Sequence, residues 1–300
     1  ESVARLIVPN RRGGYLIRVW KSLREQRPSH YFYDTRTGSQ SPFWGAVQAV
    51  VVAALLFLFD VVPITILTNL PARRWRRQVS AVTANRGLVL VLIPRSLALE
   101  YFPHDRIIGP IFMPFSQARM TEIRQGIPKN IAGSEGQSVT FIGSVYEPRS
   151  TIIDQIRREF DSSNLSFISH ERSPGFPKID QETYWEVLRN SAFLFTTADH
   201  ILKRGADLGC PPHMVYRYTE ALIAESCLIA PDIGSGLVPY EHFIPFTDAR
   251  TLKEDLSELL ASPEKIENLR KQGARFIESR VSSQKWWREI DEALGQDRLK

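Results

Sequence analysis

The sequence predicts an α/β protein with two tandem domains, each built on a doubly wound parallel sheet. Short apolar runs alternate with amphipathic stretches along most of the chain, the pattern of parallel βαβ units. The length of 300 residues exceeds one typical domain. A hydrophobic content of 43% and a charged content of 24% are those of a globular protein, which excludes wholesale disorder.

The first half has the expected alternation of strands and helices. Residues 15–26 predict a helix because Leu16, Val19, Trp20 and Leu23 recur on one side. The paired Gly13 and Gly14 precede it, and they would let backbone N–H groups approach a ligand at a helix N-terminus. The remaining elements expected here are strands 4–9, 30–34, 64–69 and 88–94 and helices 43–59 and 73–85.

Residues 43–67 permit two interpretations. Phe43 to Phe59 carry no charge and four arginines follow at 73–77, as beside a membrane span. However, Asp60 and Pro63 interrupt the apolar run where a full span would still need helix. We expect a buried helix that ends near Phe59, a turn and a parallel strand; the alternative is a helix embedded in a membrane or resting on one.

The second half also alternates strands and helices. Its expected strands are 138–143, 164–169, 192–197 and 227–232, and its expected helices are 149–160, 181–191, 217–226, 251–262 and 263–280. Residues 113–137 are rich in Gly, Pro and polar residues and contain the boundary between the domains. We therefore expect domains at 1–118 and 119–283, with a C-terminal helix in 284–300 that packs back on the first.

Charge, cysteine content and missing motifs limit the ligands and enzyme classes that the sequence allows. The net charge of +5 and the isoelectric point near 9.2 give weak support to an anionic ligand or surface. Cys210 and Cys227 form no CxxC or Cys/His spacing, so we expect neither a disulfide framework nor a zinc site, and a reducing, cytoplasmic compartment fits best. Residues 3–14 read as strand and loop, not as a signal peptide. The patterns GxGxxG and GxxxxGK[ST] are missing, which disfavours a nicotinamide enzyme and a P-loop NTPase.

Ligands of open α/β sheets bind at the carboxyl ends of the strands, and two such domains would face each other across a cleft. The segment after strand 138–143 therefore supplies candidates: Gly143, Ser144, Tyr146 and Arg149. A cation at Arg149 opposes the helix dipole unless an anion is near. The alternative is that Arg149 faces solvent and has no role in binding.

The long loop before residue 217 supplies more candidates. Lys203 and His213 are placed to face a diphosphate, and the helix then begins near Arg217. Arg217 and Glu220 fall three apart on its first turns. They are either site residues or a simple surface pair worth about 0.2–0.5 kcal/mol.

Three segments together resemble a known family: 141-FIGSVYEPR-149, 217-RYTEALIAESCLIAPD-232 and the run 251–290 with its S-P-E and aromatic tail. They are similar to the donor-binding domain of GT-B glycosyltransferases of group 1. The nearest group is the spore-maturation-protein-like transferases, with the exostosin-like group close behind. The resemblance covers about residues 138–294 and implies two Rossmann-like domains facing a cleft.

The resemblance implies a transferase that uses a nucleoside diphosphate sugar as donor and needs no cofactor. In such enzymes the glutamate of this helix binds the ribose hydroxyls, which corresponds to Glu220. The nearby basic residue, here Arg217, holds the diphosphate, and Tyr218 lies between them. A carboxylate accepts two hydrogen bonds from a diol and a guanidinium forks onto phosphate. No DxD stretch is present, which suits a metal-independent mechanism.

One departure concerns the mechanism. Many members of the broader group carry a second glutamate eight positions before the first, where this chain has Pro212. Retention is therefore unsupported, and inversion, which needs a general base, is at least as well favoured. The candidate bases at strand ends are Asp34, His104 and Asp105.

Two other classes stay open. One is a non-catalytic nucleotide-sugar-binding protein, and the other is a membrane-anchored partner in a glycan pathway. The acceptor is a glycan, a lipid-linked species or a protein, with no nucleic acid expected. The arginines at 73–77 allow a peripheral membrane contact or a solvated helix face.

Overall fold

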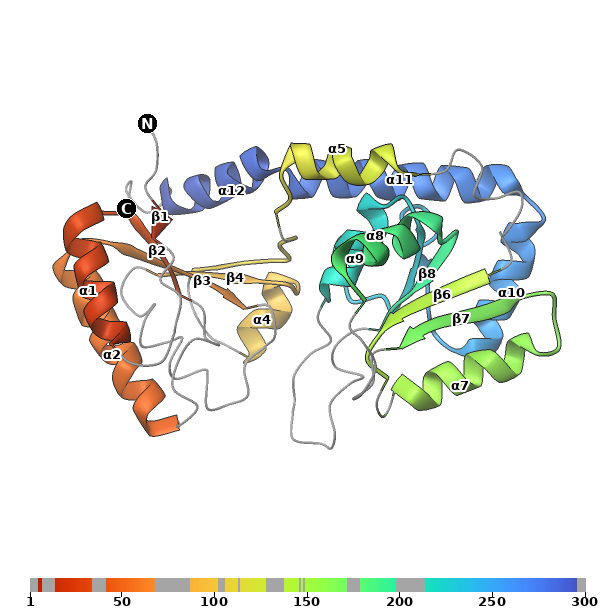
Figure 1. Cartoon of the computed structure of the whole chain (residues 1–300), viewed down its shortest axis with the longest axis horizontal. Coiled ribbons are helices and arrows are strands. Elements are labelled where there is room, and N and C mark those ends of the chain that lie inside the picture. Colours follow the sequence, from red (N-terminus) through yellow and green to blue (C-terminus); the bar gives the residue numbers. More distant parts are fainter. Residues whose placement is uncertain are drawn as a thin grey trace. The chain divides into compact units, whose positions relative to one another are not determined.

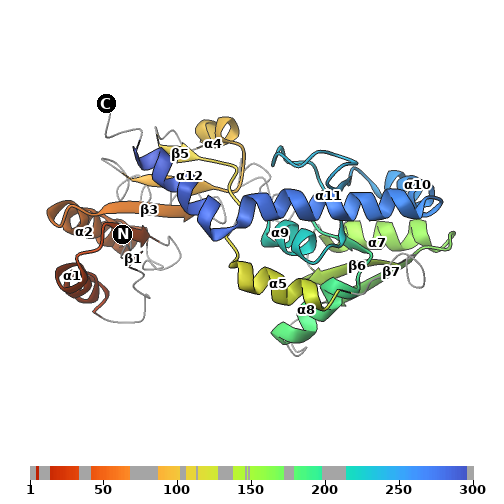
Figure 2. The same cartoon turned by 90° about the horizontal axis from the view of Figure 1, so that it is seen from above.

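The computed structural model describes residues 5–6, 14–33, 42–67, 87–101, 106–112, 114–127, 138–145, 147, 149–171, 179–197 and 214–295. The described residues up to Ile111 form one compact unit and those from Phe112 onward form a second (Figures 1 and 2). From the sequence we placed the boundary after residue 118. The expected packing of 284–300 on the first domain stays a prediction.

The first unit contains a parallel sheet whose described strands follow chain order, so the doubly wound order expected from the sequence is wrong for the described part of this sheet. The order is β1 (Arg5–Leu6), β2 (His30–Tyr33), β3 (Val62–Leu67), β4 (Leu88–Val91) and β5 (Ile107–Ile108). The helices are α1 (Tyr15–Gln26), α2 (Pro42–Leu58) and α4 (Arg95–Tyr101). The helix expected over 15–26 is confirmed. The sequence did not predict α4 or β5, and the helix expected over 73–85 lies outside the described residues.

Helix α2 is apolar almost all round, yet the structure buries only one side of it. Ala49, Val52 and Leu56 pack with α1 in one hydrophobic cluster. Val50 and Phe57 face outward and are more than half exposed. The expectation of a buried helix is therefore wrong for its outer side, because nothing among the described residues covers it. No helix in the described part of the chain is long and apolar enough to cross a membrane.

The second unit is doubly wound. Its parallel sheet has the order β10 (Ile244–Pro245), β9 (Cys227–Ala230), β8 (Phe193–Phe195), β6 (Ser138–Gly143), β7 (Ser166–Glu171). The chain leaves β6 toward one edge through α7 (Arg149–Phe160) and returns through α8 (Gln181–Asn190) to β8 on the other side of β6. Right-handed crossovers then place α7 on one face and α8 and α9 (Tyr216–Ile223) on the other (Figure 1).

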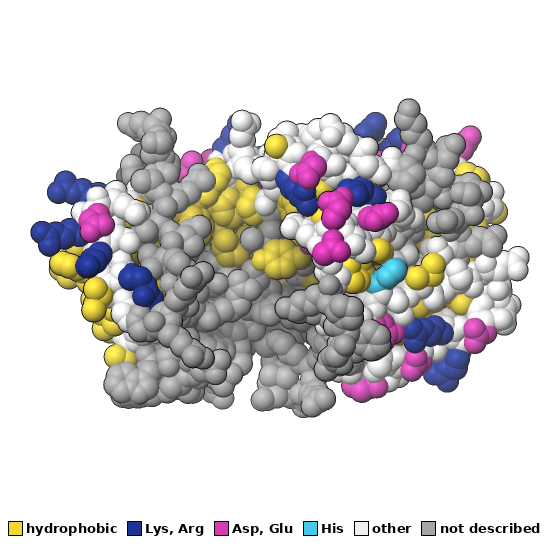
Figure 3. All heavy atoms as spheres, viewed as in Figure 1, with side chains coloured by type: hydrophobic (Ala, Val, Ile, Leu, Met, Phe, Trp, Pro, Cys, Tyr) yellow, Lys and Arg dark blue, Asp and Glu magenta, His cyan; other side chains and the backbone are white. Residues whose placement is uncertain are grey.

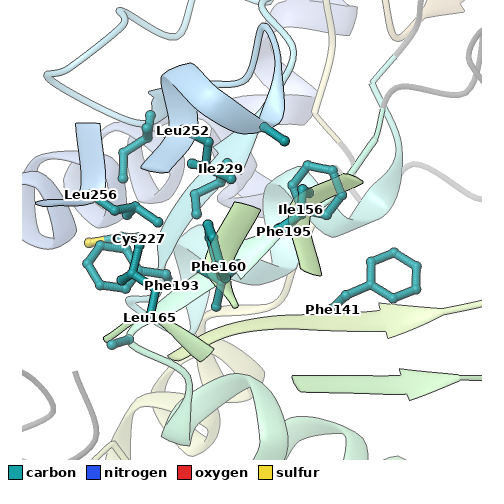
Figure 4. Close-up of a cluster of buried hydrophobic side chains, with 14 of the residues drawn as sticks. Phe141, Ile156, Phe160, Leu165, Phe193, Phe195, Cys227, Ile229, Leu252 and Leu256 are labelled. Carbon is teal, nitrogen blue, oxygen red and sulfur yellow. The ribbon is translucent and has the colours of Figure 1, made fainter. Parts of the chain in front are cut away.

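The main core lies between the sheet and the layer formed by α7 and α10 (Ala249–Leu260). Ile153, Ile156 and Phe160 of α7 recur at helical spacing, so one stripe of that helix is buried. It meets aromatic residues of the central strands, among them Phe193 and Phe195 (Figure 4). This packing fixes where β6 and α7 end and begin, and thereby the position of the loop between them.

The described part of the second unit has three more helices: α5 (Gln117–Gln125), α11 (Pro263–Val281) and α12 (Ser283–Gly295). Helix α11 packs closely on α9 at Gly273. A Cβ there would stand 2.7 Å from the carbonyl oxygen of His242 and 2.8 Å from Cδ2 of Leu222. Arg270 of α11 donates from Nε to the carbonyl oxygen of Glu225, just past the end of α9, at 2.6 Å. Helix α9 is thus held from behind.

Candidate functional site

A cavity of about 410 Å³ lies at the carboxyl ends of β6 and β8 in the second unit. The chain leaves these two adjacent strands toward opposite edges of the sheet, so they form its topological switch point. Open α/β sheets bind ligands at such points. The cavity is lined by Phe141, Ile142, Gly143, Ser144, Arg149, His170, Glu171, Ile179, Tyr184, Thr196, Val215, Tyr216, Arg217 and Glu220.

Two guanidinium groups lie close to Gly143 at the end of β6. A Cβ on Gly143 would stand 3.6 Å from Nη1 of Arg217 and 3.8 Å from Nη1 of Arg149. Gly143 has a φ of 151°, a conformation that side-chain-bearing residues rarely adopt. Two cations brought together repel each other, so the arrangement favours an anion beside Gly143.

Arg149 is buried at the first position of α7, with 8% of its surface exposed. Its Nε donates to Oγ1 of Thr197 at 3.0 Å, and its Nη1 donates to the carbonyl oxygen of Ser144 at 2.5 Å. The guanidinium also lies 5.4 Å from the centre of the Phe141 ring. The alternative of an arginine that faces solvent is therefore wrong, and the side chain is held in one orientation.

Helix α9 presents the other charged pair because of its sequence pattern. Tyr218, Ala221 and Leu222 are buried against the core, while Arg217 and Glu220 share the opposite side and line the cavity. Val215, the residue before the helix, provides no side-chain cap. The N–H of Tyr218 donates to the carbonyl oxygen of Val215 at 3.0 Å, and the amino end of α9 is the positive end of the helix dipole.

Tyr184 of α8 joins this pair. Its hydroxyl donates to Oε2 of Glu220 at 2.5 Å, and the guanidinium of Arg217 lies 5.3 Å from the centre of its ring. Nε of Arg217 is 3.7 Å from the same Oε2, and each of the two charged side chains is 21% exposed. Burial raises the pKa of Tyr184, with the Arg217 cation opposing the shift, so the phenol stays protonated and is a hydrogen-bond donor at neutral pH.

Tyr184 and Arg217 both approach one oxygen of Glu220. Oε2 of Glu220 is shared by Tyr184 and Arg217, whereas Nε of Arg217 is buried and has no hydrogen-bond partner among the described residues. A pair formed only for surface solubility would not need a tyrosine from another helix. We conclude that Arg217 and Glu220 are part of an organised, partly buried site.

At the β7 edge of the cavity, the carboxylate of Glu171 already has hydrogen-bond partners within the protein. Oε1 of Glu171 accepts from Nη2 of Arg157 at 2.9 Å and from the hydroxyl of Ser169 at the same distance. His170 lies beside Glu171 on the cavity wall. This side therefore offers the imidazole and neighbouring backbone, while the cations gather on the side of β6 and α9.

The structure brings together Gly143, Ser144, Arg149, Arg217 and Glu220 among the residues predicted from sequence. Tyr218 is fully buried, and its hydroxyl donates to the carbonyl oxygen of Pro231 at 2.8 Å, so it does not line the cavity. Gly14 lies in the first unit, where it precedes α1 with a φ of 67°. Predictions at Gly13, Asp34, His104, Asp105, Tyr146, Lys203, Pro212 and His213 lie outside the described residues.

Sequence reasoning missed Tyr184, Thr197 and His170. In the sequence Tyr184 is only one residue of an amphipathic helix, and its partner Glu220 is 36 positions away. No spacing rule joins residues so far apart. The one usable signal was that Thr197 and His170 stand at or near the carboxyl ends of strands, the positions where ligands bind.

No group of three or more His, Cys, Asp or Glu side chains within the described ranges is placed to hold a metal ion. Among the residues that the structure places, the positive groups of the cavity are arginines and the amino end of α9. Metal independence stays a prediction.

The sequence matches no family model and no curated protein. Its structure is similar to HepE of Anabaena in complex with UDP-glucose, with a TM-score of 0.58, 12% identity and coverage of 97% of this chain and 85% of that chain. An α-glucosyltransferase in complex with UDP and a 13-mer DNA has a TM-score of 0.61, 12% identity and coverage of 93% and 84%. TarM has a TM-score of 0.60, 11% identity and coverage of 93% and 58%. The chain therefore has the α/β fold with two parallel sheets of GT-B glycosyltransferases.

Proposed function

We propose that the chain is a glycosyltransferase that moves a sugar from a nucleoside diphosphate sugar to an acceptor hydroxyl. The observation that carries this proposal is the meeting of Arg149 and Arg217 beside Gly143, with Glu220 next to them, at the switch point of a sheet. This combination provides for a multiply charged anion and a polar diol within one cavity.

The diphosphate is the natural ligand for the two arginines. Guanidinium groups bind phosphate oxygens through paired hydrogen bonds, and the amino end of α9 adds the positive end of a helix dipole. Arg149 is held by Thr197 and the Ser144 carbonyl, so its cation is oriented before a ligand arrives. Such preorganisation lowers the cost of binding.

The ribose is the natural ligand for Glu220. A carboxylate accepts hydrogen bonds from the two hydroxyls of a cis-diol. Because Tyr184 and Arg217 engage Oε2, Oε1 is the oxygen better placed to take the ribose hydroxyls. Tyr184 is then a positioning residue that acts through Glu220.

In the proposed reaction the acceptor oxygen forms a bond to the anomeric carbon, and the bond from that carbon to the diphosphate oxygen breaks. Negative charge develops on the departing diphosphate, where Arg149, Arg217 and the α9 dipole would stabilise it. The acceptor proton passes to a general base, for which Asp34, His104 and Asp105 remain the candidates.

The finer features of the proposal come from the family resemblance. They are a hexosyl or related sugar, metal independence and a place near the spore-maturation-protein-like transferases. The similar structures hold UDP-glucose in HepE and UDP in the α-glucosyltransferase. These complexes support UDP-sugars as the first donors to test.

The test is nucleotide binding by the full chain. UDP-, GDP-, TDP- and CMP-sugars are added singly, and the melting temperature and release of nucleotide are measured. A donor at about a hundred times its Kd is expected to raise the melting temperature by roughly 5 °C or more. Glu220→Ala should remove most of that shift, whereas Glu254→Ala, at an exposed carboxylate of α10, should not.

Each result has a definite meaning. Nucleotide release that depends on Glu220 supports the transferase. Tight binding without turnover, even when acceptors are supplied, would instead identify a non-catalytic nucleotide-sugar-binding protein. If no nucleotide sugar changed the melting temperature, the proposed function would be wrong.

A further inference from the structure

The outer side of α2 is an exposed apolar surface in the first unit, remote in sequence from the donor site. Val47, Val50, Phe57 and Leu58 are exposed by 38%, 58%, 63% and 76%. They recur over three turns of one helix, with the exposed Ala54 between them and no charged residue among them. Soluble surfaces rarely gather so much apolar area on one element, so this side is expected to meet a partner.

Helix α1 extends the same surface and adds charge. The two helices pack on each other, as Figures 1 and 2 show, and consecutive right-handed crossovers place them in one layer. Ile17 and Trp20 of α1 are exposed by 61% and 39%. The guanidinium of Arg24 lies 5.4 Å from the centre of the Trp20 ring, and Lys21 is exposed beside them.

The charge on this layer is mainly positive. Helix α1 contains Arg18, Lys21 and Arg24 against the single Glu25, a net charge of +2 by this count. Helix α2 itself has no carboxylate, and Asp60 follows two residues after its last residue. Figure 3 shows the basic side chains beside exposed hydrophobic ones along this edge of the first unit.

We propose that the α1–α2 surface, made of Ile17, Trp20, Lys21, Arg24, Val47, Val50, Phe57 and Leu58, docks the protein on an anionic lipid bilayer. The apolar side chains would enter the boundary between headgroups and acyl chains, while Lys21 and Arg24 pair with lipid phosphates. The inner side of α2 belongs to the protein core, so the helix would lie along the interface.

The positive charge of the α1–α2 surface favours an anionic bilayer over a second copy of the chain as its partner. Facing copies of the same surface would bring their cations together, and like charges repel. An anionic membrane instead complements both features, because it offers apolar depth and phosphates at once. The inference does not depend on the proposed donor site, which lies in the other unit.

The experiment is flotation of the full chain with vesicles of phosphatidylcholine alone and of phosphatidylcholine with phosphatidylglycerol. Binding is expected only to the anionic vesicles and should weaken as salt is added. The double variant Val50→Asp/Phe57→Asp should reduce the partition coefficient by about tenfold or more. Lys21→Glu/Arg24→Glu should reduce it by a similar factor. Val238→Asp, at a residue 44% exposed in the second unit, is the matched control.

Circular dichroism and binding of UDP by the same variants show whether they remain folded. Anionic vesicle binding that both double variants lose and the control keeps would support the proposal. It would be overturned by absent vesicle binding, by equal binding to neutral vesicles or by binding that survives both double variants. Concentration-dependent self-association abolished by Val50→Asp/Phe57→Asp would also overturn it, since the surface would then join two copies.

Discussion

The hydroxyl of Tyr184 donates to Oε2 of Glu220 at 2.5 Å, and this bond joins α8 to α9 across the cavity wall. The two residues belong to helices on the same face of the sheet, and Arg217 lies over the tyrosine ring. The carboxylate is therefore oriented before any ligand binds.

The first prediction concerns Tyr184→Phe. The ring remains under Arg217, but Glu220 loses its donor and its carboxylate becomes free to rotate. We expect the Kd for a nucleoside diphosphate to rise roughly fivefold, which corresponds to about 1 kcal/mol. Isothermal titration calorimetry measures it. Tyr240→Phe, which removes a phenol hydroxyl that donates to Oδ2 of Asp255 outside this cavity, is the control, and equal effects of the two changes would contradict a positioning role.

The second prediction concerns Arg217→Lys. Lysine keeps the charge but loses the planar fork that binds two phosphate oxygens. We expect binding of the nucleoside diphosphate to weaken by more than about tenfold, while binding of the nucleoside alone changes little. Arg158→Lys, on the exposed side of α7, serves as the matched control. A nucleoside that weakened as much as its diphosphate would show that Arg217 does not contact phosphate.

The third prediction compares two glycines with positive φ, Gly143 and Gly236. Alanine at either position strains the backbone, at a cost of about 1–3 kcal/mol. At Gly143 the new Cβ would also fill the space between the two guanidinium groups, whereas nothing lies within 4 Å of a Cβ at Gly236. We expect both variants to melt earlier and only Gly143→Ala to bind diphosphate more weakly. Equal binding by both variants would argue against an anion at Gly143.

The fourth prediction is a dependence of stability on pH through His242. Burial lowers the pKa of His242 below its ordinary value of 6.5, although Glu241 opposes the shift. Its Nδ1 accepts the Val238 N–H at 2.9 Å, which requires the unprotonated nitrogen. As pH falls below 6.5 the unfolded chain takes up the proton first, so this contribution is present above 6.5 and is lost toward the lower folded pKa.

Thermal melting between about pH 5 and pH 8 measures this effect. The melting temperature of the native chain should fall on the acid side, and His242→Gln should flatten that fall. A hydrogen bond from Arg124 also lowers the pKa of Glu278. The stability that this carboxylate contributes is lost only as the pH falls below its ordinary pKa of 4.5, so it does not affect the melting temperature in this range. An unchanged slope in His242→Gln would exclude this histidine as the cause.

The second domain could be predicted from the sequence in some detail because its signals are local. Strand 138–143 and helix 149–160 have the expected bounds, since β-branched and apolar runs end at glycine and at an arginine-led amphipathic stretch. The charged residues Arg149, Arg217 and Glu220 could be placed at one edge of the sheet from strand direction alone.

Long-range contacts could not be predicted in the same way. Arg149 has the sequence signature of an exposed residue, and only its partners Thr197 and Ser144 explain its burial. Tyr184 meets Glu220 because α8 and α9 lie on one face of the sheet, which no local pattern encodes. The burial of helix α2 was predicted wrongly for a local reason. Its sequence is apolar all round, so it has no periodicity that separates the buried side from the exposed side.

The close approach of α11 to α9 at Gly273 has a consequence for engineering. The amino end of α9 carries the candidate donor contacts, while its other end rests on Arg270 and on a glycine that admits no side chain. A methyl group at Gly273 would press on the carbonyl oxygen of His242 and on Leu222, and would strain the packing of α11 on α9, the helix that holds Arg217 and Glu220. Binding in the cavity could therefore be tuned from the back of the domain, and libraries confined to the cavity lining would omit this position.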